Sequence, residues 1–87
     1  MMLNDGYTVT ENFYNAVRYQ VDDVIPVLVR DMKYTSEMLC GDVFWKPLTD
    51  GEKRMAGRCI ANMVVSGLLP FDFAETKHEY PKRYQLH

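Results

Sequence analysis

Apolar residues recur with the period of a helix over residues 49–67, the most regular pattern in the chain. Thr49 and Glu52 form a T-x-x-E capping box at its start, and Gly67 can take the left-handed conformation that closes a helix. The pattern therefore predicts a helix from Thr49 to Gly67. One face is apolar and is expected to be buried: Met55, Ala56, Cys59, Ile60, Met63 and Val64. The opposite face has no acidic residue and carries Arg54, Arg58, Ala61, Asn62 and Val65.

Two more helices are predicted upstream of this one. A second T-x-x-E sequence at Thr8 to Glu11 precedes apolar residues at helical spacing, so we expect a first helix that breaks near residues 21–23. Helical spacing resumes from Val24 to Cys40 and predicts a second helix, with Gly41 as its stop. Its apolar face would hold Ile25, Leu28, Val29, Met32, Thr35, Ser36 and Leu39. The connector at residues 41–48 is expected to be a short extended piece folded onto the core.

After Gly67 the period changes to two. Leu69, Phe71 and Phe73 alternate with their neighbours, which is typical of a strand, and Pro70 limits this strand to a sheet edge. Residues 83–86 alternate again, so the pair predicts a β-hairpin. The expected fold is a single domain of residues 1–87, mainly α with a C-terminal β-hairpin (α+β): three helices plus a wing-like hairpin. The expected core comprises Val17, Ile25, Leu28, Val29, Met32, Leu39, Trp45, Ile60, Met63, Val64 and Phe71.

Composition and charge narrow the function classes. The 87 residues are 47% hydrophobic and 13% aromatic, which excludes an intrinsically disordered chain. Residues 1–45 contain three Lys or Arg against seven Asp or Glu, whereas residues 46–87 contain seven against five. A uniformly basic nucleic-acid-binding surface is therefore excluded, but a local basic patch on the second half is not.

The two cysteines, Cys40 and Cys59, lie within apolar helical patterns, and no long apolar run accompanies them. We expect reduced core thiols in a cytoplasmic protein that does not enter a membrane. A zinc site would combine these cysteines with His78 and His87, at gaps too long for a zinc finger. The sequence thus predicts neither a metal site nor a cofactor.

No catalytic motif is present. The chain lacks a glycine-rich phosphate loop, a nucleophile elbow and an H-E-x-x-H zinc sequence. His78 and Glu79 are adjacent in an expected loop where nothing would perturb their pKa values, and Asp22 with Asp23 suits a helix cap better than a proton-transfer pair. We therefore predict that the protein is not an enzyme.

The order of helix, glycine stop, apolar edge strand, polar loop and returning Tyr-x-Leu strand over residues 43–87 resembles the winged-helix DNA-binding superfamily. The resemblance implies a DNA-binding regulator of transcription whose helix at residues 49–67 enters the major groove of double-stranded DNA. Arg54, Arg58, Ala61 and Asn62 would face the bases, and Lys77, His78, Lys82 and Arg83 would contact phosphates from the hairpin. In the major groove, arginine can form two hydrogen bonds with guanine, and asparagine can form two with adenine. The connector at residues 41–48 is longer than the turn of about three to four residues in a helix-turn-helix.

A second function class stays open from the sequence alone. The chain could be a protein–protein interaction module, such as a phage- or plasmid-borne inhibitor or adaptor that acts on a host protein, working as a monomer or a homodimer. Tyr34, Phe44, Trp45, Tyr80 and Tyr84 are of the residue types that form binding hot spots. The two classes differ in whether acidic residues of the first half neutralise Arg54 and Arg58. We expect the acids of the second predicted helix to lie on the far side of the core.

Overall fold

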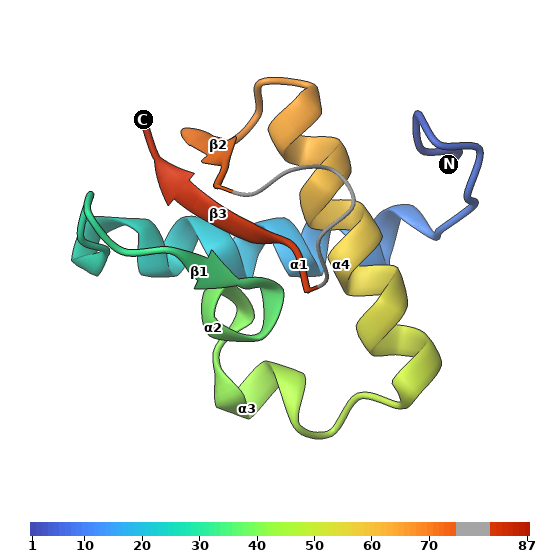
Figure 1. Ribbon diagram of the computed structural model, residues 1–87. Coiled ribbons are helices and arrows are strands. Elements are labelled where there is room, and N and C mark those ends of the chain that lie inside the picture. Colours follow the sequence, from blue (N-terminus) through green and yellow to red (C-terminus); the bar gives the residue numbers. More distant parts are fainter. Residues whose placement is uncertain (75–80) are drawn as a thin grey trace.

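The computed structural model describes residues 1–74 and 81–87 and folds them into helices packed against one small sheet (Figure 1). In chain order the elements are α1 (Glu11–Val24), the 3₁₀ turn η1 (Ile25–Val27), β1 (Tyr34–Thr35), α2 (Ser36–Cys40), α3 (Asp42–Trp45), α4 (Asp50–Val65), β2 (Phe71–Phe73) and β3 (Arg83–Leu86). The predicted α+β class is confirmed, because helices dominate the chain and an antiparallel strand pair closes it.

The helix α4 is the one that the capping box predicts. Thr49 Oγ1 accepts a hydrogen bond from the Glu52 amide at 3.1 Å, and Glu52 Oε1 accepts one from the Thr49 amide at 2.8 Å. Gly67 follows the helix with φ of 75°, in the left-handed region that favours glycine. Residues next to each other in the sequence thus fix both ends of α4. At its start, the capping box supplies hydrogen-bond partners for backbone amides that a helix end leaves unpaired.

The helix α1 starts two residues later than the sequence predicts. Thr10, not Thr8, is the N-cap, and its hydroxyl accepts a hydrogen bond from the Phe13 amide at 3.1 Å. Thr8 instead forms an isolated antiparallel bridge with Met2. The prediction that Thr8 is the N-cap is wrong. Either threonine can cap a helix, and the backbone bridge of Thr8 to Met2 leaves Thr10 as the cap.

The expected break near residues 21–23 and the expected helix Val24–Cys40 are both wrong. The helix α1 runs through the expected break and continues as η1, after which the backbone becomes extended at Leu28, with φ of −77° and ψ of 152°. Of the predicted helix Val24–Cys40, only the last turn forms a separate α-helix. This turn is α2, which ends at Gly41 as predicted. The strand β1 replaces helix because Tyr34 pairs with Tyr84 of β3, 50 residues further along the chain. Local spacing carries no information about that pairing.

The connector at residues 41–48 is not extended as expected. Its residues Asp42–Trp45 form the single helical turn α3. Phe44 and Trp45 are half-buried and pack against the core, whereas Val43 is 94% exposed. The expectation that this apolar triplet covers the core holds for the two aromatic residues only.

The sheet contains three antiparallel strands in the order β1-β3-β2. The hairpin of β2 and β3 is confirmed, with Phe71 opposite Leu86 and Phe73 opposite Tyr84. The strand β2 lies at an edge, as Pro70 predicts. The short strand β1 pairs with the other side of β3 and joins the hairpin to α2.

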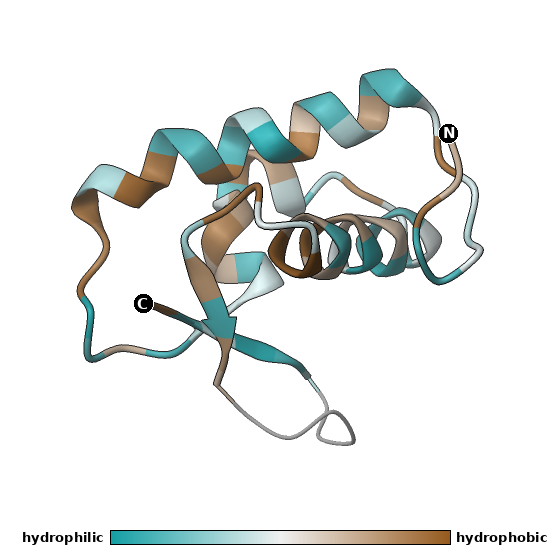
Figure 2. Cartoon of the chain, turned by 90° about the horizontal axis from the view of Figure 1, so that it is seen from above, coloured by the Kyte–Doolittle hydropathy of each residue, from teal (hydrophilic) through white to brown (hydrophobic). Residues whose placement is uncertain are grey.

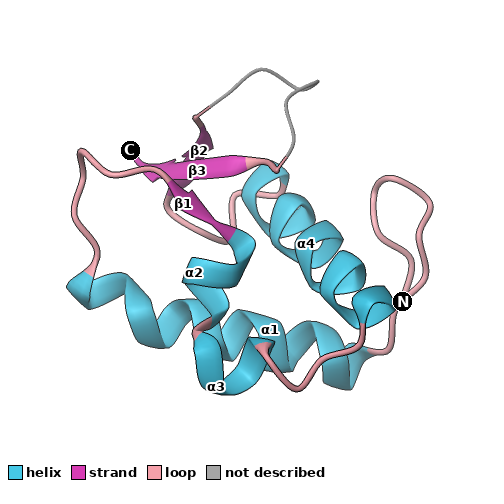
Figure 3. Ribbon diagram, turned by 60° about the horizontal axis from the view of Figure 1, so that its bottom comes forward, coloured by secondary structure: helices cyan, strands magenta, loops and turns pink. Residues whose placement is uncertain are grey.

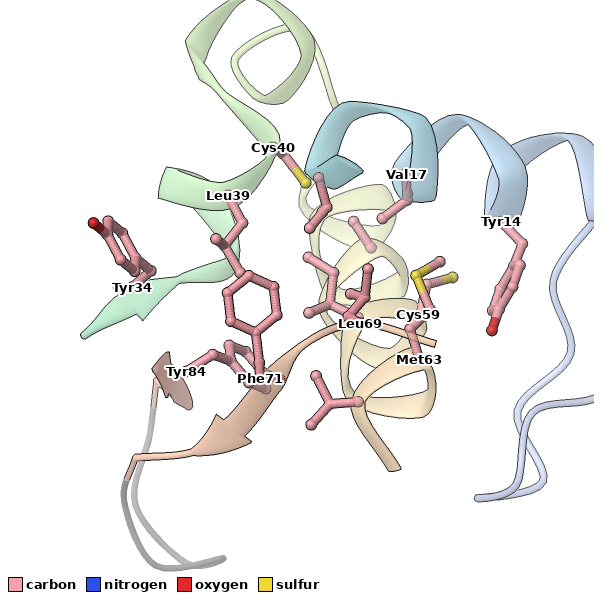
Figure 4. Packing of buried hydrophobic residues seen from close by; sticks show 14 of the residues in the cluster. Tyr14, Val17, Tyr34, Leu39, Cys40, Cys59, Met63, Leu69, Phe71 and Tyr84 are labelled. Atoms are coloured by element: carbon pink, nitrogen blue, oxygen red, sulfur yellow. The ribbon is translucent and has the colours of Figure 1, made fainter. Parts of the chain in front are cut away.

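The core lies between α1, α2, α4 and the sheet (Figure 4). Both α1 and α4 carry hydrophobic and hydrophilic residues along their length (Figure 2), and the two helices supply half of the buried hydrophobic residues of this core. Of the residues expected there, six are buried: Val17, Leu39, Ile60, Met63, Val64 and Phe71. Ile25, Leu28 and Trp45 are half-buried. Val29 and Met32 are 52% and 50% exposed, because the segment that holds them is not helical.

Candidate nucleic-acid interface

The outward face of α4 and the foot of the hairpin line one open groove of about 720 Å³. Arg54, Arg58 and Ala61 lie along the α4 side, and Lys82 lies on the hairpin side. Both arginines are exposed, and Ala61 is half-buried. The structure therefore brings together four of the residues that the winged-helix resemblance assigns to DNA.

The groove is only weakly basic. Among the described residues that line it, the cationic ones are Lys53, Arg54, Arg58 and Lys82, and the carboxylates are those of Asp5, Glu37 and Asp50. Glu37 was expected on the far side of the core, and its presence in the groove lining corrects that expectation. An excess of a single positive charge permits contact with a few phosphates but gives no strong long-range field.

Arg58 is held by the segment that precedes α1. Its Nη1 donates a hydrogen bond to Asp5 Oδ2 at 3.1 Å, and its guanidinium carbon lies 4.5 Å from the centre of the Tyr7 ring. The hydrogen bond that Asp5 accepts from the Tyr7 amide, followed by the influence of Arg58, holds the pKa of the Asp5 carboxyl below its ordinary value. Asp5 is therefore ionised at neutral pH and forms a charged pair with Arg58.

Arg54 differs from Arg58 in this respect. Among residues 1–74 and 81–87, no carboxylate lies within salt-bridge distance of it. Asp22, one of the acids whose position was to decide between the two function classes, pairs with Arg18 on α1 at 3.7 Å. The acidic half of the chain thus neutralises Arg58 through Asp5 and leaves Arg54 available.

Asn62 does not belong to the outward face, which corrects the sequence prediction. It is only 9% exposed, and both ends of its amide are engaged inside the protein. Its Oδ1 accepts a hydrogen bond from the Tyr14 hydroxyl at 2.7 Å, and its Nδ2 donates one to Asn4 Oδ1 at 3.0 Å. Burial raises the pKa of Tyr14, so its hydroxyl stays protonated and donates. This amide is not free to read an adenine.

Of the four hairpin residues that were expected to contact phosphates, the structure describes Lys82 and Arg83. Lys77 and His78 lie outside the described residues, as does Tyr80 of the alternative set. Lys82 is exposed, with its Nζ 6.0 Å from the centre of the Phe73 ring. Arg83 is half-buried in β3, opposite Thr35 of β1, and does not line the groove.

Two of the aromatic residues of the alternative hypothesis, Tyr34 and Tyr84, are core residues. Tyr34 is 8% exposed and Tyr84 is fully buried, and the Tyr34 hydroxyl accepts a hydrogen bond from the Val29 amide at 2.8 Å. Phe44 and Trp45 are half-buried, and Trp45 also lines the groove. The expectation that these tyrosines present a surface to a partner is therefore wrong for Tyr34 and Tyr84.

The two cysteines are core residues, as predicted. Cys40 and Cys59 are both free and buried, and burial raises the pKa of Cys40 to about 12 and that of Cys59 to about 11. Within the described part of the chain, no three His, Cys, Asp or Glu side chains are grouped as metal ligands would be. No helix found there combines the length and the apolar character that a membrane crossing requires.

Comparisons with protein-family models, with curated proteins and with solved structures found no match to this chain. A functional assignment consequently depends on the fold and on the groove beside α4. Asp5 and Gly57, which line this groove, and Tyr7, which contacts Arg58, are absent from the site residues that the sequence predicts. Gly57 in the middle of a helix was a visible signal, because glycine lowers helix stability unless a close approach requires it. Asp5 is 53 residues from its partner and gave no such signal.

Proposed function

We propose that this protein is a small, non-enzymatic DNA-binding regulatory protein of the winged-helix type. The observation that carries the proposal is the groove in which Arg54 and Arg58 of α4 meet Lys82 from the foot of the hairpin. An exposed helix with two arginines one turn apart suits the major groove, whose width of about 12 Å admits an α-helix. A neighbouring hairpin suits the flanking phosphates.

The topology supports the same proposal. The resemblance rests on a helix that is followed by an edge strand and a returning strand, and α4, β2 and β3 follow one another in that order. Here β1 lies between α1 and α2, and the sheet order is β1-β3-β2. The extra turn α3 lies between α2 and α4, where a shorter turn would be usual. This departure lengthens the connector but leaves the order of helices and strands intact.

The weak positive charge of the groove sets the expected strength of binding. Phosphates would be neutralised mainly by Lys53, Arg54 and Lys82, because Asp5 already pairs with Arg58. With three phosphates neutralised, the slope of log K against log salt concentration is about −3. Binding to random duplex is therefore expected at low salt and is expected to weaken as salt rises.

The test is fluorescence anisotropy of a labelled random-sequence duplex at several salt concentrations. Arg54→Glu and Lys82→Glu should each abolish binding at low salt without lowering the melting temperature, because both side chains are exposed. Arg30→Glu is the matched control, since it changes the net charge equally at an exposed site that does not line the groove. It should leave most of the binding intact.

Two results would overturn the proposal. One is the absence of duplex binding by the unaltered protein at low salt and high protein concentration. The other is an equal loss of binding in Arg30→Glu and Arg54→Glu, which would reveal a general charge effect rather than a site. Either result favours the alternative of a protein–protein interaction module. Exposed apolar side chains such as Val43, at 94%, and Val27, at 73%, would then be the first to replace.

A further inference from the structure

The first ten residues form a compact loop beside α4 (Figure 3). Leu3 and Val9 are 3% and 4% exposed and anchor this loop in the core. Between them the Leu3 amide donates to the Tyr7 carbonyl at 2.7 Å, and Gly6, with φ of 86°, makes the turn. The loop is therefore a folded part of the domain, and it holds its polar side chains at defined positions.

These polar side chains contact two successive turns of α4. Asp5 and Tyr7 hold the guanidinium of Arg58, and Asn4 accepts a hydrogen bond from Asn62, four residues further along the helix. The loop is thus aligned with the outward face of α4. Asp5 and Arg58 both line the groove, so their pair lies where the proposed DNA would bind.

The two arginines of the groove consequently have different properties. Arg54 has no carboxylate within salt-bridge distance in the described part of the chain, so no ion pair there competes with a phosphate for its guanidinium. Arg58 is charge-paired and has an oriented guanidinium plane. A guanidinium has five N–H donors, of which the bond to Asp5 uses one. The others remain for a second acceptor, and less side-chain freedom is lost when they bind it.

We propose a division of roles that rests on the DNA-binding function above: Arg58, positioned by Asp5 and Tyr7, reads a base edge, whereas Arg54 contacts phosphate. The base is guanine, because its O6 and N7 offer the paired acceptors that a planar guanidinium matches. Asp5 and Tyr7 are positioning residues in this arrangement. Their effect is on sequence selectivity rather than on overall affinity.

The experiment first selects duplexes from a random pool with the unaltered protein. Binding is then measured for the selected duplex and for versions in which each G·C pair is replaced. One replacement should weaken binding by at least about fivefold, the lower limit for one bidentate base contact. Arg58→Ala should abolish that discrimination. Arg54→Ala should instead weaken binding to all duplexes alike and reduce the salt slope by about 1.

Asp5→Asn tests the positioning role. The asparagine Oδ1 can still accept the Tyr7 amide, so the loop keeps its turn, but the amide nitrogen cannot accept from Arg58. Discrimination should fall at least about fivefold at the same base pair. Asp22→Asn is the matched control, because it removes the same charge from α1, where Asp22 pairs with Arg18. Tyr7→Leu, which removes the ring under Arg58, should act in the same direction as Asp5→Asn.

The outcomes separate this inference from the function on which it rests. If the unaltered protein binds no duplex, both proposals fail. If it binds but selects no sequence, or if Arg58→Ala keeps the discrimination, only the division of roles fails. If Asp5→Asn binds every duplex more tightly and discriminates as before, Asp5 merely neutralises Arg58, and the positioning role is wrong.

Discussion

The contact between Tyr14 and Asn62 is a polar bond on an otherwise apolar side of α4. Tyr14 is 5% exposed and Asn62 is 9% exposed, and the hydroxyl donates to the amide oxygen at 2.7 Å. Tyr14→Phe should lower the unfolding free energy by about 1–3 kcal/mol, because it leaves a buried acceptor without a partner. Urea denaturation monitored by circular dichroism measures the change.

Tyr19→Phe is the control for this substitution. Tyr19 lies on the same helix and is 70% exposed, so removal of its hydroxyl should change the unfolding free energy by less than about 0.5 kcal/mol. Equal effects of the two substitutions would mean that water replaces the Tyr14 hydroxyl at Asn62.

Ile60 tests which face of α4 is buried. Its side chain is fully buried in the core cluster, so Ile60→Ala should cost about 2–5 kcal/mol through the cavity that it leaves. Ile60→Val removes one methylene from the same site and should cost about 0.5–1.5 kcal/mol. The same denaturation measurement applies. A loss below about 0.5 kcal/mol in the alanine variant would place this stripe against solvent.

At the scale of the element, two glycines should respond in opposite directions to alanine. Gly41 joins α2 to α3 with φ of 81° and ψ of 153°, a region almost reserved for glycine, so Gly41→Ala should cost about 1–3 kcal/mol. Gly57 lies inside α4, and a Cβ there would meet Ser36 Oγ at 3.7 Å, an ordinary contact. Gly57→Ala should therefore stabilise the protein by about 0.5–1 kcal/mol.

Thermal unfolding of both variants checks this pair. A destabilised Gly57→Ala would mean that α2 cannot accommodate the added methyl group and that close packing against Ser36 requires the glycine. A neutral Gly41→Ala would mean that the junction between α2 and α3 can change its backbone conformation at little cost.

The elements that the sequence predicts correctly are those with local causes. The helix α4 has its capping box, its apolar stripe and its terminal glycine within one segment, and the hairpin has period-two alternation on both sides of a polar loop. The predicted helix Val24–Cys40 is wrong because β1 forms through pairing with β3 at the other end of the chain. Tertiary pairing overrides local propensity there, and no local pattern reveals it.

The same distinction applies to the candidate site. Arg54 and Arg58 could be predicted on the outward face, because helical periodicity alone puts them opposite the buried stripe. Asn62 could not be excluded from that face, because the first ten residues cover it from a distance of 58 positions in the sequence. Asp5 escaped notice for the same reason. Periodicity gives the direction of a side chain and says nothing of what covers it.

For the whole molecule, the charge asymmetry of the sequence is reduced by folding. The acidic first half places Asp5 and Glu37 in the same groove as the cations of α4. Four cationic and three acidic residues of the described chain line the groove, so a nucleic acid would bind through a few defined contacts rather than through a broad basic surface. Under the proposed DNA-binding function, sequence-selective contacts would then matter more than net charge does.

The core also sets how the stability of the whole molecule depends on pH. Burial raises the pKa of Cys59 to about 11 and the pKa values of Cys40 and Tyr84 to about 12, whereas exposed thiols ionise near 9.0 and exposed phenols near 10.0. Raised pKa values mean that the unfolded chain loses these protons first as pH rises. Stability should therefore be unaffected by these groups below pH 9.0 and should fall from there through about pH 11 to 12.

Melting temperatures at a series of pH values up to 11 measure this decline. Cys59→Ala should start from a lower melting temperature, because it leaves a cavity, but its decline above pH 9.0 should be shallower, because one buried group no longer titrates. An unchanged slope in this variant would assign the decline to Cys40 and Tyr84. A melting temperature that stays constant up to pH 11 would contradict the burial of all three groups, since a buried group keeps its proton to a higher pH in the folded chain than in the unfolded one.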